Sequence, residues 1–371
     1  MIKNRFEAVW WFIVDRQRTS KLQGRVLLKR VQTASRAEIL REFESTCQAL
    51  AASDNRGFKQ EFQELKDVGK DLPTKTADLE ANREKNRYPY VLPYDHCRVR
   101  LTIQNFPNTD YINASFVPGG GSERDFICTQ APMHHTMEAF WRMVWEQNVR
   151  IIAMVTALRD RDMVLCDEYW SLEPGTVYHG PFQVTTMARK QGPDYFISTI
   201  NLRQKDSPTD RIITHYHYPS WPDRGVPKDP SSLCNFTDHV RQHLDAIPRL
   251  GPAVVHCSAG VGRSGTFVAL LWLMQLCVRG VRPNIRAAVA DLRLHRMGMV
   301  QMLEQYIFVH QCLLYWISGG KSSCLTLLDD TNRELTRRNR HHRRKQSAGQ
   351  EQSTLQQILQ PGKLLRRILP S

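Results

Sequence analysis

The chain of 371 residues is 41% hydrophobic, and this length allows one sizeable folded domain with flanking segments. Its formal charge of +14 divides into +6 in residues 1–35, +7 in residues 319–371 and only +1 between them. Because the basic surplus is confined to the flanks, the charge argues against a nucleic-acid-binding domain, and no nucleic-acid partner is expected.

Three segments are predicted along the chain. Residues 1–34 form a basic leader, residues 35–318 the folded domain and residues 319–371 a basic, disordered tail. The basic flanks are candidates for contact with an anionic membrane surface, and merely solvated segments are the alternative. The longest apolar run, 267–278, is too short to span a bilayer core of about 30 Å and predicts a buried helix.

In chain order, the first predicted helix begins at Ser35. Ser35 and Glu38 have the spacing of a capping box, and apolar residues recur on one face as far as residue 50. A second helix is expected around residues 58–65, ending near Gly69. Short alternating apolar runs between Asn, Pro and Gly clusters predict hairpin strands within residues 95–127.

The rest of the domain mixes strands with helices. A helix over residues 138–147 is expected to lead into a strand over 149–155. Further strands are predicted over 182–187, 194–202, 212–218 and 253–255, and further helices over 230–246, 265–276, 285–292 and 303–316. This alternation predicts an α/β or α+β domain with a large, highly twisted mixed β-sheet flanked by helices.

A strand followed by small residues and then a helix predicts an anion site. The residues after the strand at 253–255 are His256, Cys257, Ser258, Ala259, Gly260, Val261, Gly262, Arg263 and Ser264. Such a turn directs backbone N–H groups and the positive end of a helix dipole at one point. The expected anion is a phosphate group.

Cys257 lies at the mouth of this predicted site, where the same electrostatics favour its thiolate. Cysteine pKa values fall from about 8.5 to between about 3.5 and 7.5 in such settings, so Cys257 is a candidate nucleophile. Arg263 supplies a planar fork suited to two phosphate oxygens. The Cys-x5-Arg spacing alone is a weak pattern, and a buried structural cysteine is the alternative interpretation.

Cleavage of a phosphate ester needs an acid that protonates the leaving oxygen, and Asp223 is the candidate. It lies in the sequence SWPDRGVP at residues 220–227, where Trp221, Pro222 and Gly225 indicate a shaped loop that closes over a ligand. A surface turn of the common Pro-Asp kind is the alternative interpretation.

Several separate motifs resemble those of the classical protein tyrosine phosphatases. They are KNRY at 85–88, DYINAS at 110–115, TQAP at 129–132, FWRMVWEQ at 140–147, CDEYW at 166–170, WPD at 221–223, HCSAGVGRSG at 256–265 and QMLEQY at 301–306. They occur in the family's order, and the resemblance covers residues from about 43 to 317. It implies the tyrosine phosphatase fold and removal of phosphate from phosphotyrosine in proteins, with no cofactor and no metal.

The resemblance also implies a role for each matching residue. Cys257 attacks phosphorus, Arg263 holds the phosphate, and Asp223 acts first as an acid and then as a base. The other catalytic residues are Ser264 at the departing thiolate, Gln301 and Gln305 at the hydrolytic water, and His256 as a support of the loop. The substrate-binding set is Ser258, Ala259, Gly260, Val261, Gly262, Tyr88, Tyr90 and Trp221, with Tyr88 lining a pocket deep enough for phosphotyrosine.

Some positions near the site depart from the family pattern. Tyr90 stands where many members have Asp or Asn, Leu165 replaces a common lysine and Asp160 a common glutamate. Further departures are Met302, Ala131 and Ser171. They leave open a phosphotyrosine-binding pseudophosphatase without turnover. Tyr88 and the framework motifs argue against a dual-specificity or lipid phosphatase.

Residues 42–101 look most like receptor-type members with fibronectin-repeat ectodomains, including the osteotesticular type. By this resemblance the basic leader corresponds to a juxtamembrane segment, and the chain to a cytosolic fragment or variant. Nine cysteines without CxxC spacing fit a reducing compartment. The expected location is the cytoplasm, or the cytoplasmic side of the plasma membrane.

Overall fold

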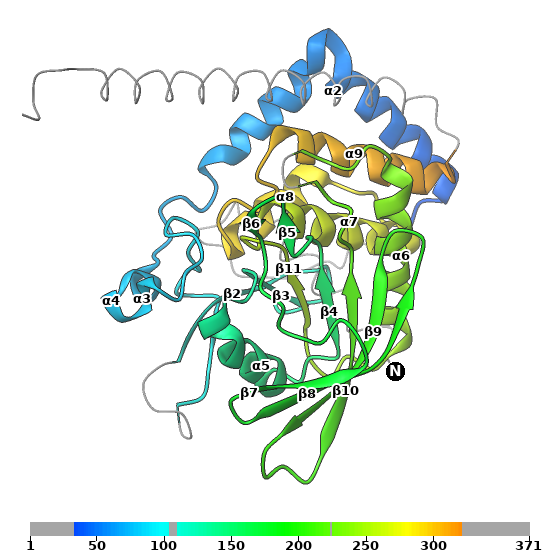
Figure 1. The fold of residues 1–371 in the computed structure, drawn as a ribbon. Coiled ribbons are helices and arrows are strands. Elements are labelled where there is room, and N and C mark those ends of the chain that lie inside the picture. The colour runs from blue at the N-terminus through cyan, green and yellow to red at the C-terminus, as the bar shows by residue number, and fades with distance from the viewer. Residues whose placement is uncertain (1–32, 104–109, 223–224, 321–371) are drawn as a thin grey trace, which may run out of the picture.

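A nine-stranded mixed β-sheet forms the centre of the structure, a computed structural model that describes residues 33–103, 110–222 and 225–320 (Figure 1). The strand order is β1 (Arg98–Arg100), β2 (Tyr111–Val117), β3 (Phe126–Thr129), β11 (Ala253–His256), β4 (Ile151–Met154), β10 (Asp210–His217), β9 (Phe196–Gln204), β8 (Phe182–Gln191) and β7 (Gly175–His179). The four strands from β3 to β10 are parallel, and the outer pairs are antiparallel.

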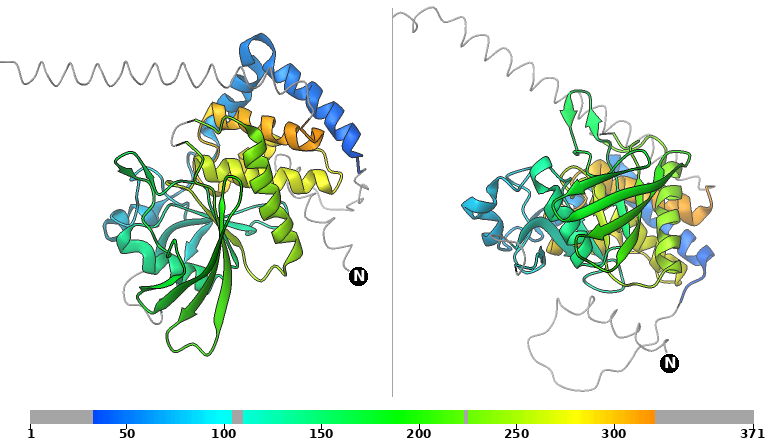
Figure 2. Two further views of the ribbon diagram at one scale, coloured as in Figure 1. Left: turned by 45° about the vertical axis from the view of Figure 1, so that its right-hand side comes forward. Right: turned by 60° about the horizontal axis from the view of Figure 1, so that its bottom comes forward.

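Helices cover both faces of this sheet. One face carries α2 (Arg36–Glu64), α6 (Pro230–Ala246), α7 (Gly262–Val278), α8 (Ile285–His295) and α9 (Leu303–Ser318), and the other carries α5 (Met137–Glu146) (Figure 1). The blue α2 lies over the orange α9 both there and in the left view of Figure 2, where the strong twist of the sheet is also visible. The predicted fold class is confirmed.

The central strands divide their apolar side chains between two cores. In β11, Val255 packs in the core beneath α7 and α9, whereas Val254 packs in the core beneath α5. Ala153 and Ile152 of β4 divide in the same way. Successive side chains of a strand point to opposite faces, so a continuous apolar run fills both cores. The segment 267–276 of α7 is buried, which confirms the predicted buried helix.

Short elements connect these layers in the described part of the chain. They are η1 (Leu65–Asp67), α3 (Lys75–Asp78), α4 (Glu80–Arg83), η2 (His134–Thr136), β5 (Arg159–Asp160) and β6 (Met163–Val164). The loop between α4 and residue 91 lies beside the residues that follow β11, because Tyr88 Oη is hydrogen-bonded to Ser258 Oγ.

The predicted first helix begins as expected. Ser35 Oγ accepts the N–H of Glu38, and the Glu38 carboxylate accepts the N–H of Ser35. The two helices expected here are the two arms of α2, which meet at a kink over residues 52–55. Ser53, Asp54 and Asn55 have positive φ there.

Among the later elements, the bounds predicted for α6 are the observed ones. Asp229 accepts the N–H of Ser231 as the N-cap, and Pro230 takes the first helical position, where it suits a helix start. The edge strand β7 was not predicted, nor were the short elements α3, α4, β5 and β6.

No helix within residues 33–103, 110–222 and 225–320 is long and apolar enough to cross a membrane. The predicted leader and tail lie almost entirely outside the described residues. The eight described cysteines are free thiols.

Candidate active site

The loop after β11 lies at the centre of the molecule. β11 pairs with β3 and β4, the loop spans residues 257–261, and α7 begins at Gly262. Gly260 has a φ of +73°, and a Cβ atom there would lie 2.1 Å from Thr129 O. A Cβ atom on Gly265 would lie 2.4 Å from Val300 N. Glycine at these positions lets the loop and the first turn of α7 pack directly against neighbouring backbone.

The Cys257 thiol is buried at the start of this loop. Its Sγ atom accepts the N–H of Gly260 at 3.2 Å. Burial raises the pKa of Cys257, but the charge of Arg263 and hydrogen bonds from Ser264 and Gly260 outweigh it, so the net pKa lies below its ordinary value. The loop therefore favours a thiolate in an otherwise apolar interior.

Ser264 Oγ is buried and makes no well-formed hydrogen bond within the described residues. It nevertheless lies close enough to Cys257 to lower the pKa of that thiol. A hydroxyl in this position can donate to the thiolate.

Arg263 follows Cys257 by six positions and is held beneath the loop. Its Nη1 donates to Thr156 Oγ1 at 2.6 Å. The Thr156 hydroxyl donates in turn to Ala157 O, and Thr156 O accepts from His217 Nε2 at 2.9 Å. The guanidinium direction is thus tied to β10. Asp160, which stands where a glutamate is common in the family, is exposed on β5.

Arg296 supports the back of the loop and was not identified from the sequence. It is fully buried, and it donates to Gly260 O at 2.9 Å and to Ala259 O at 3.1 Å. Its other bonds, to Asn113 Oδ1 and Ser115 Oγ, fix the guanidinium to β2. Because these loop carbonyls turn toward Arg296, the N–H of Gly260 is left to face the thiol.

His256 joins the loop to a buried hydrogen-bond chain. Its Nδ1 lies 3.1 Å from Cys257 O, and its Nε2 lies 2.7 Å from Tyr169 Oη. The same Tyr169 oxygen lies 2.6 Å from His215 Nε2. Burial lowers the pKa of His256 to about 3, so this imidazole is neutral.

The recognition loop, residues 85–91, forms one rim of the site. Tyr88 Oη and Ser258 Oγ are hydrogen-bonded at 2.8 Å, and Ser258 Oγ also donates to Leu165 O. Arg87 fixes this rim to the body of the domain through Gln130, Ala131, Pro132, Val164 and Asp167. Tyr90 is 89% exposed. Tyr88 therefore contacts the catalytic loop, whereas Tyr90 stands at the outer edge.

Two predicted water-binding residues lie beside the loop. Gln305 is buried, and its Oε1 accepts the N–H groups of Gln301 and Met302 at 3.0 and 3.3 Å. A Cβ atom on Gly262 would lie 2.9 Å from Gln305 Nε2 and 3.4 Å from Gln301 Cβ. The absence of a side chain at Gly262 admits both glutamines to the loop.

Trp221 is buried at the base of the predicted mobile loop. Its Nε1 donates to Gly225 O at 3.2 Å, and its ring meets Phe308 edge-on. These contacts anchor the loop, and direct contact of Trp221 with substrate stays a prediction. Asp223, the predicted acid, lies outside the described residues.

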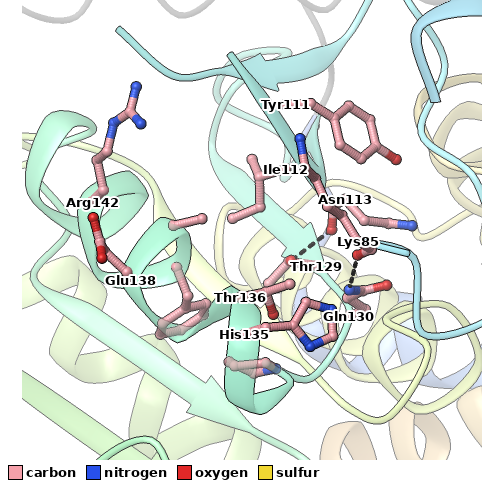
Figure 3. Close-up of a pocket in the computed structure, with 13 residues that line it drawn as sticks. Lys85, Tyr111, Ile112, Asn113, Thr129, Gln130, His135, Thr136, Glu138 and Arg142 are labelled. Atoms are coloured by element: carbon pink, nitrogen blue, oxygen red, sulfur yellow. Dashed lines mark hydrogen bonds between the residues drawn. The ribbon is translucent and has the colours of Figure 1, made fainter. Parts of the chain in front are cut away.

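A separate pocket of about 280 Å³ lies behind the recognition loop (Figure 3). Its lining residues are Lys85, Tyr111, Ile112, Asn113, Thr129, Gln130, Pro132, His135, Thr136, Glu138, Ala139, Phe140 and Arg142. Two of them are joined by a hydrogen bond, which Gln130 Nε2 donates to Lys85 O at 2.8 Å. None of these residues belongs to the Cys257 loop. Within the described ranges, no three His, Cys, Asp or Glu side chains are grouped to hold a metal ion.

A buried thiol with a lowered pKa and a buried arginine meet at the N-terminus of α7, an arrangement that can bind a phosphate-like anion. The family model described as protein-tyrosine phosphatase matches residues 82–315. The chain belongs to this family. The residues that form the loop, its arginine and its glutamines all fall within the matched region.

Several relatives are receptor-type proteins. The chain is 43% identical over 282 residues to receptor-type tyrosine-protein phosphatase V of Rattus norvegicus, covering 76% of this chain and 16% of that protein. It is 37% identical over 332 residues to receptor-type tyrosine-protein phosphatase eta of Mus musculus, covering 89% of this chain and 27% of that protein. The expected resemblance to receptor-type members is confirmed. The chain thus spans about a quarter or less of these relatives.

Proposed function

We propose that this chain hydrolyses phosphotyrosine in proteins through a cysteinyl-phosphate intermediate. The observation that carries the proposal is Cys257, whose pKa is lowered although its thiol is buried at the N-terminus of α7. A buried structural cysteine has a raised pKa instead, as Cys97 and Cys128 do, at about 12. The local field thus selects one thiol for nucleophilic chemistry.

In the first step, the phosphate binds the loop N–H groups and Arg263. The Cys257 thiolate attacks phosphorus, the P–S bond forms, and the bond from phosphorus to the tyrosyl oxygen breaks. Asp223 gives its proton to that oxygen, because a tyrosinate is a poor leaving group. The products are free tyrosine in the protein and a phosphorylated cysteine.

In the second step, a water molecule held by Gln301 and Gln305 attacks the phosphocysteine. Asp223 takes a proton from this water, the P–S bond breaks, and inorganic phosphate leaves. Ser264 donates to the departing thiolate, which is supported by its effect on the pKa of Cys257. Tyr88 selects tyrosine over serine because its position at the rim requires a long side chain to reach the thiol.

The predicted domain boundaries, 35–318 for the catalytic domain with basic flanks on either side, belong to the same proposal. So do phosphotyrosine-containing proteins as substrates, a cytoplasmic location and contact of the flanks with anionic membranes. The family match from 82 to 315 and the beginning of α2 at residue 36 support the domain assignment.

The test is hydrolysis of matched phosphotyrosine and phosphoserine peptides in the presence of a chelator. We expect tyrosine-selective turnover that Cys257→Ser abolishes and that Asp223→Ala slows while phosphopeptide binding remains. Cys277→Ser is the matched control, because this half-buried thiol lies at the far end of α7. A strict need for added metal, or unchanged turnover in Cys257→Ser, would refute the mechanism.

A pseudophosphatase that binds phosphotyrosine proteins is the second candidate. Leu165 is buried where many relatives are expected to carry a lysine, and Tyr90 offers no carboxylate at the rim. Tight phosphopeptide binding by the wild type without turnover would select this alternative, and Leu165→Lys and Tyr90→Asp would then be the first reversions to measure.

A further inference from the structure

The side chains of His215, Tyr169 and His256 form a buried row of hydrogen bonds. His215 lies in β10, Tyr169 follows the β5–β6 hairpin, and His256 ends β11. All three side chains are buried, and the two hydrogen bonds measure 2.6 and 2.7 Å. Three elements distant in the sequence therefore meet at one hydroxyl group.

Each member of the chain is neutral at physiological pH. Burial lowers the pKa of His256 to about 3 and that of His215 well below its ordinary value, and burial raises the pKa of Tyr169. The positive charge of Arg189 also lowers the pKa of His215. Each imidazole thus holds one N–H, and the tyrosine holds its O–H.

The position of each proton in this row of hydrogen bonds follows from its last acceptor, the carbonyl oxygen of Cys257. Cys257 O is a carbonyl oxygen and only accepts, so His256 Nδ1, at 3.1 Å, must carry the proton. His256 Nε2 is then an acceptor, and the Tyr169 hydroxyl must donate to it. Since that hydroxyl has one proton, its oxygen accepts from His215, which must be protonated at Nε2.

His215 Nδ1 provides an independent check on this assignment. It makes no hydrogen bond within the described residues, as expected for a nitrogen without a proton. A buried N–H without an acceptor costs more than a bare nitrogen that a ring face covers. The ring of Trp170 lies against His215, with the two ring centroids 4.3 Å apart and the planes tilted by 31°.

We propose that His215 is a positioning residue for the nucleophile, acting through Tyr169 on the tautomer of His256. The His215 Nε2–H directs the Tyr169 hydroxyl toward His256, and this keeps the His256 Nδ1–H on the carbonyl of Cys257. In the opposite tautomer, the bare Nδ1 of His256 would face that carbonyl and repel it. The loop would then lose the orientation that the thiolate requires.

This inference rests on the proposed function, because it takes Cys257 as the nucleophile. Its first test measures only the tautomers of the two histidines and needs no turnover. In histidine labelled with ¹⁵N, long-range ¹H–¹⁵N correlation spectra distinguish the two tautomers. We expect His256 in the Nδ1–H form and His215 in the Nε2–H form in the wild-type protein at pH 7. The reverse tautomer at either residue would overturn the inference.

The second test measures the Cys257 thiol itself. Alkylation of the Cys257 peptide by iodoacetamide is followed by mass spectrometry between about pH 5 and 8, and it reports the pKa of the thiol. We expect His215→Leu to raise this pKa and to slow alkylation at pH 6 by about threefold to tenfold, the range of one buried hydrogen bond. His215→Gln, whose amide can donate at the Nε2 position, recovers part of the rate.

His310→Leu is the matched control. His310 is equally buried and bonds only the backbone oxygen of Tyr306 among the described residues, so its loss lowers stability without touching the chain to Cys257. A Cys257 pKa that is the same in His215→Leu and His310→Leu would overturn the inference. If the Cys257 pKa is low in the wild type and rises only in His215→Leu, but the wild type does not hydrolyse phosphotyrosine, the proposed function is refuted and the inference is supported.

Discussion

The catalytic loop and the recognition rim lie side by side but are built in opposite ways. Between Cys257 and Ser264 the backbone is held from behind by Arg296 and from the sheet by His256. At the rim, Tyr90 projects into solvent with 89% of its surface exposed. Under the proposed function, the buried loop would hold the nucleophile and the exposed rim would meet the substrate. Tyr90 itself departs from the family pattern.

The largest effect is expected from Gly260→Ala. A left-handed φ costs a non-glycine residue about 1–2 kcal/mol, and the new Cβ atom would also meet Thr129 O at 2.1 Å. The loop must shift, so we expect kcat to fall by at least about a hundredfold because the N–H groups leave their places around the phosphate.

Gly298→Ala is the control that separates these two causes. Gly298 also has a positive φ, of +68°, but nothing lies within 4 Å of its Cβ position. We expect about 1 kcal/mol of destabilisation and little loss of kcat, measured by urea unfolding and peptide hydrolysis. Equal losses of kcat in both variants would contradict the steric explanation.

Arg296→Lys tests the support behind the loop. An ammonium group cannot reproduce the planar fork that bonds Gly260 O, Ala259 O and Asn113 Oδ1 together. We expect about 2 kcal/mol of destabilisation and a fall of about tenfold to a hundredfold in kcat, with a smaller change in KM. Arg241→Lys, which alters a pair of contacts to acids on α6, serves as the control and should keep its kcat. A normal kcat in Arg296→Lys would show that the loop holds its shape without the fork.

The buried histidines predict acid sensitivity of the interior. Burial lowers the pKa of His256 to about 3 and those of His217 and His310 to about 4. Because the unfolded state takes up these protons first, their contribution to stability is complete above about pH 6.5 and is lost as the pH falls toward 4. As the pH falls from 6.5 to 5, each of these histidines lowers the free energy of unfolding by about 2 kcal/mol.

The measurement is urea unfolding of the wild type and of His310→Leu at pH 7.5 and pH 5. The variant should lose about 2 kcal/mol less than the wild type over this interval, because one buried imidazole is gone. An identical pH dependence of the two proteins would mean that His310 titrates normally in the folded state.

The smallest effect is expected at the rim. A carboxylate at position 90 can accept N–H groups of a peptide backbone, so Tyr90→Asp should lower the KM for a phosphopeptide by about twofold to tenfold, in line with one or two hydrogen bonds. The KM for a small aryl phosphate should stay unchanged. Tyr178→Asp, at another exposed tyrosine on β7, is the control. Improved kcat rather than KM would place Tyr90 in the chemistry instead of at the rim.

Much of the fold follows from local sequence signals. The start of α6 is set by Asp229 and Pro230, which are adjacent in the chain, and the start of α2 by the pair Ser35 and Glu38. β7 was missed because an edge strand that contains glycine and alternates between half-buried and exposed residues has little apolar signal. The kink in α2 was expected only as a boundary between two helices.

The residues of the site also fall into two groups, those that a local sequence signal predicts and those that only tertiary contacts define. Cys257 and Arg263 are recognisable because a strand, small residues and a helix are consecutive in the sequence. Arg296 and Thr156 carry no such signal, because their bonds to the loop and to Arg263 join residues 36 and 107 positions apart. His215 is likewise defined only by contact across the fold, 46 positions from Tyr169. Contacts of this kind depend on tertiary packing and not on local pattern.

The place of β11 in the sheet has a consequence for synthesis on the ribosome. This strand is the last of the sheet to be made, yet it inserts between β3 and β4, which are made more than a hundred residues earlier. Until it emerges, the nascent chain has two unpaired strand edges at the middle of its sheet, the kind of edge that pairs with other chains. Products that end before β11 would carry both edges and no nucleophile, so they would depend on chaperones or be degraded.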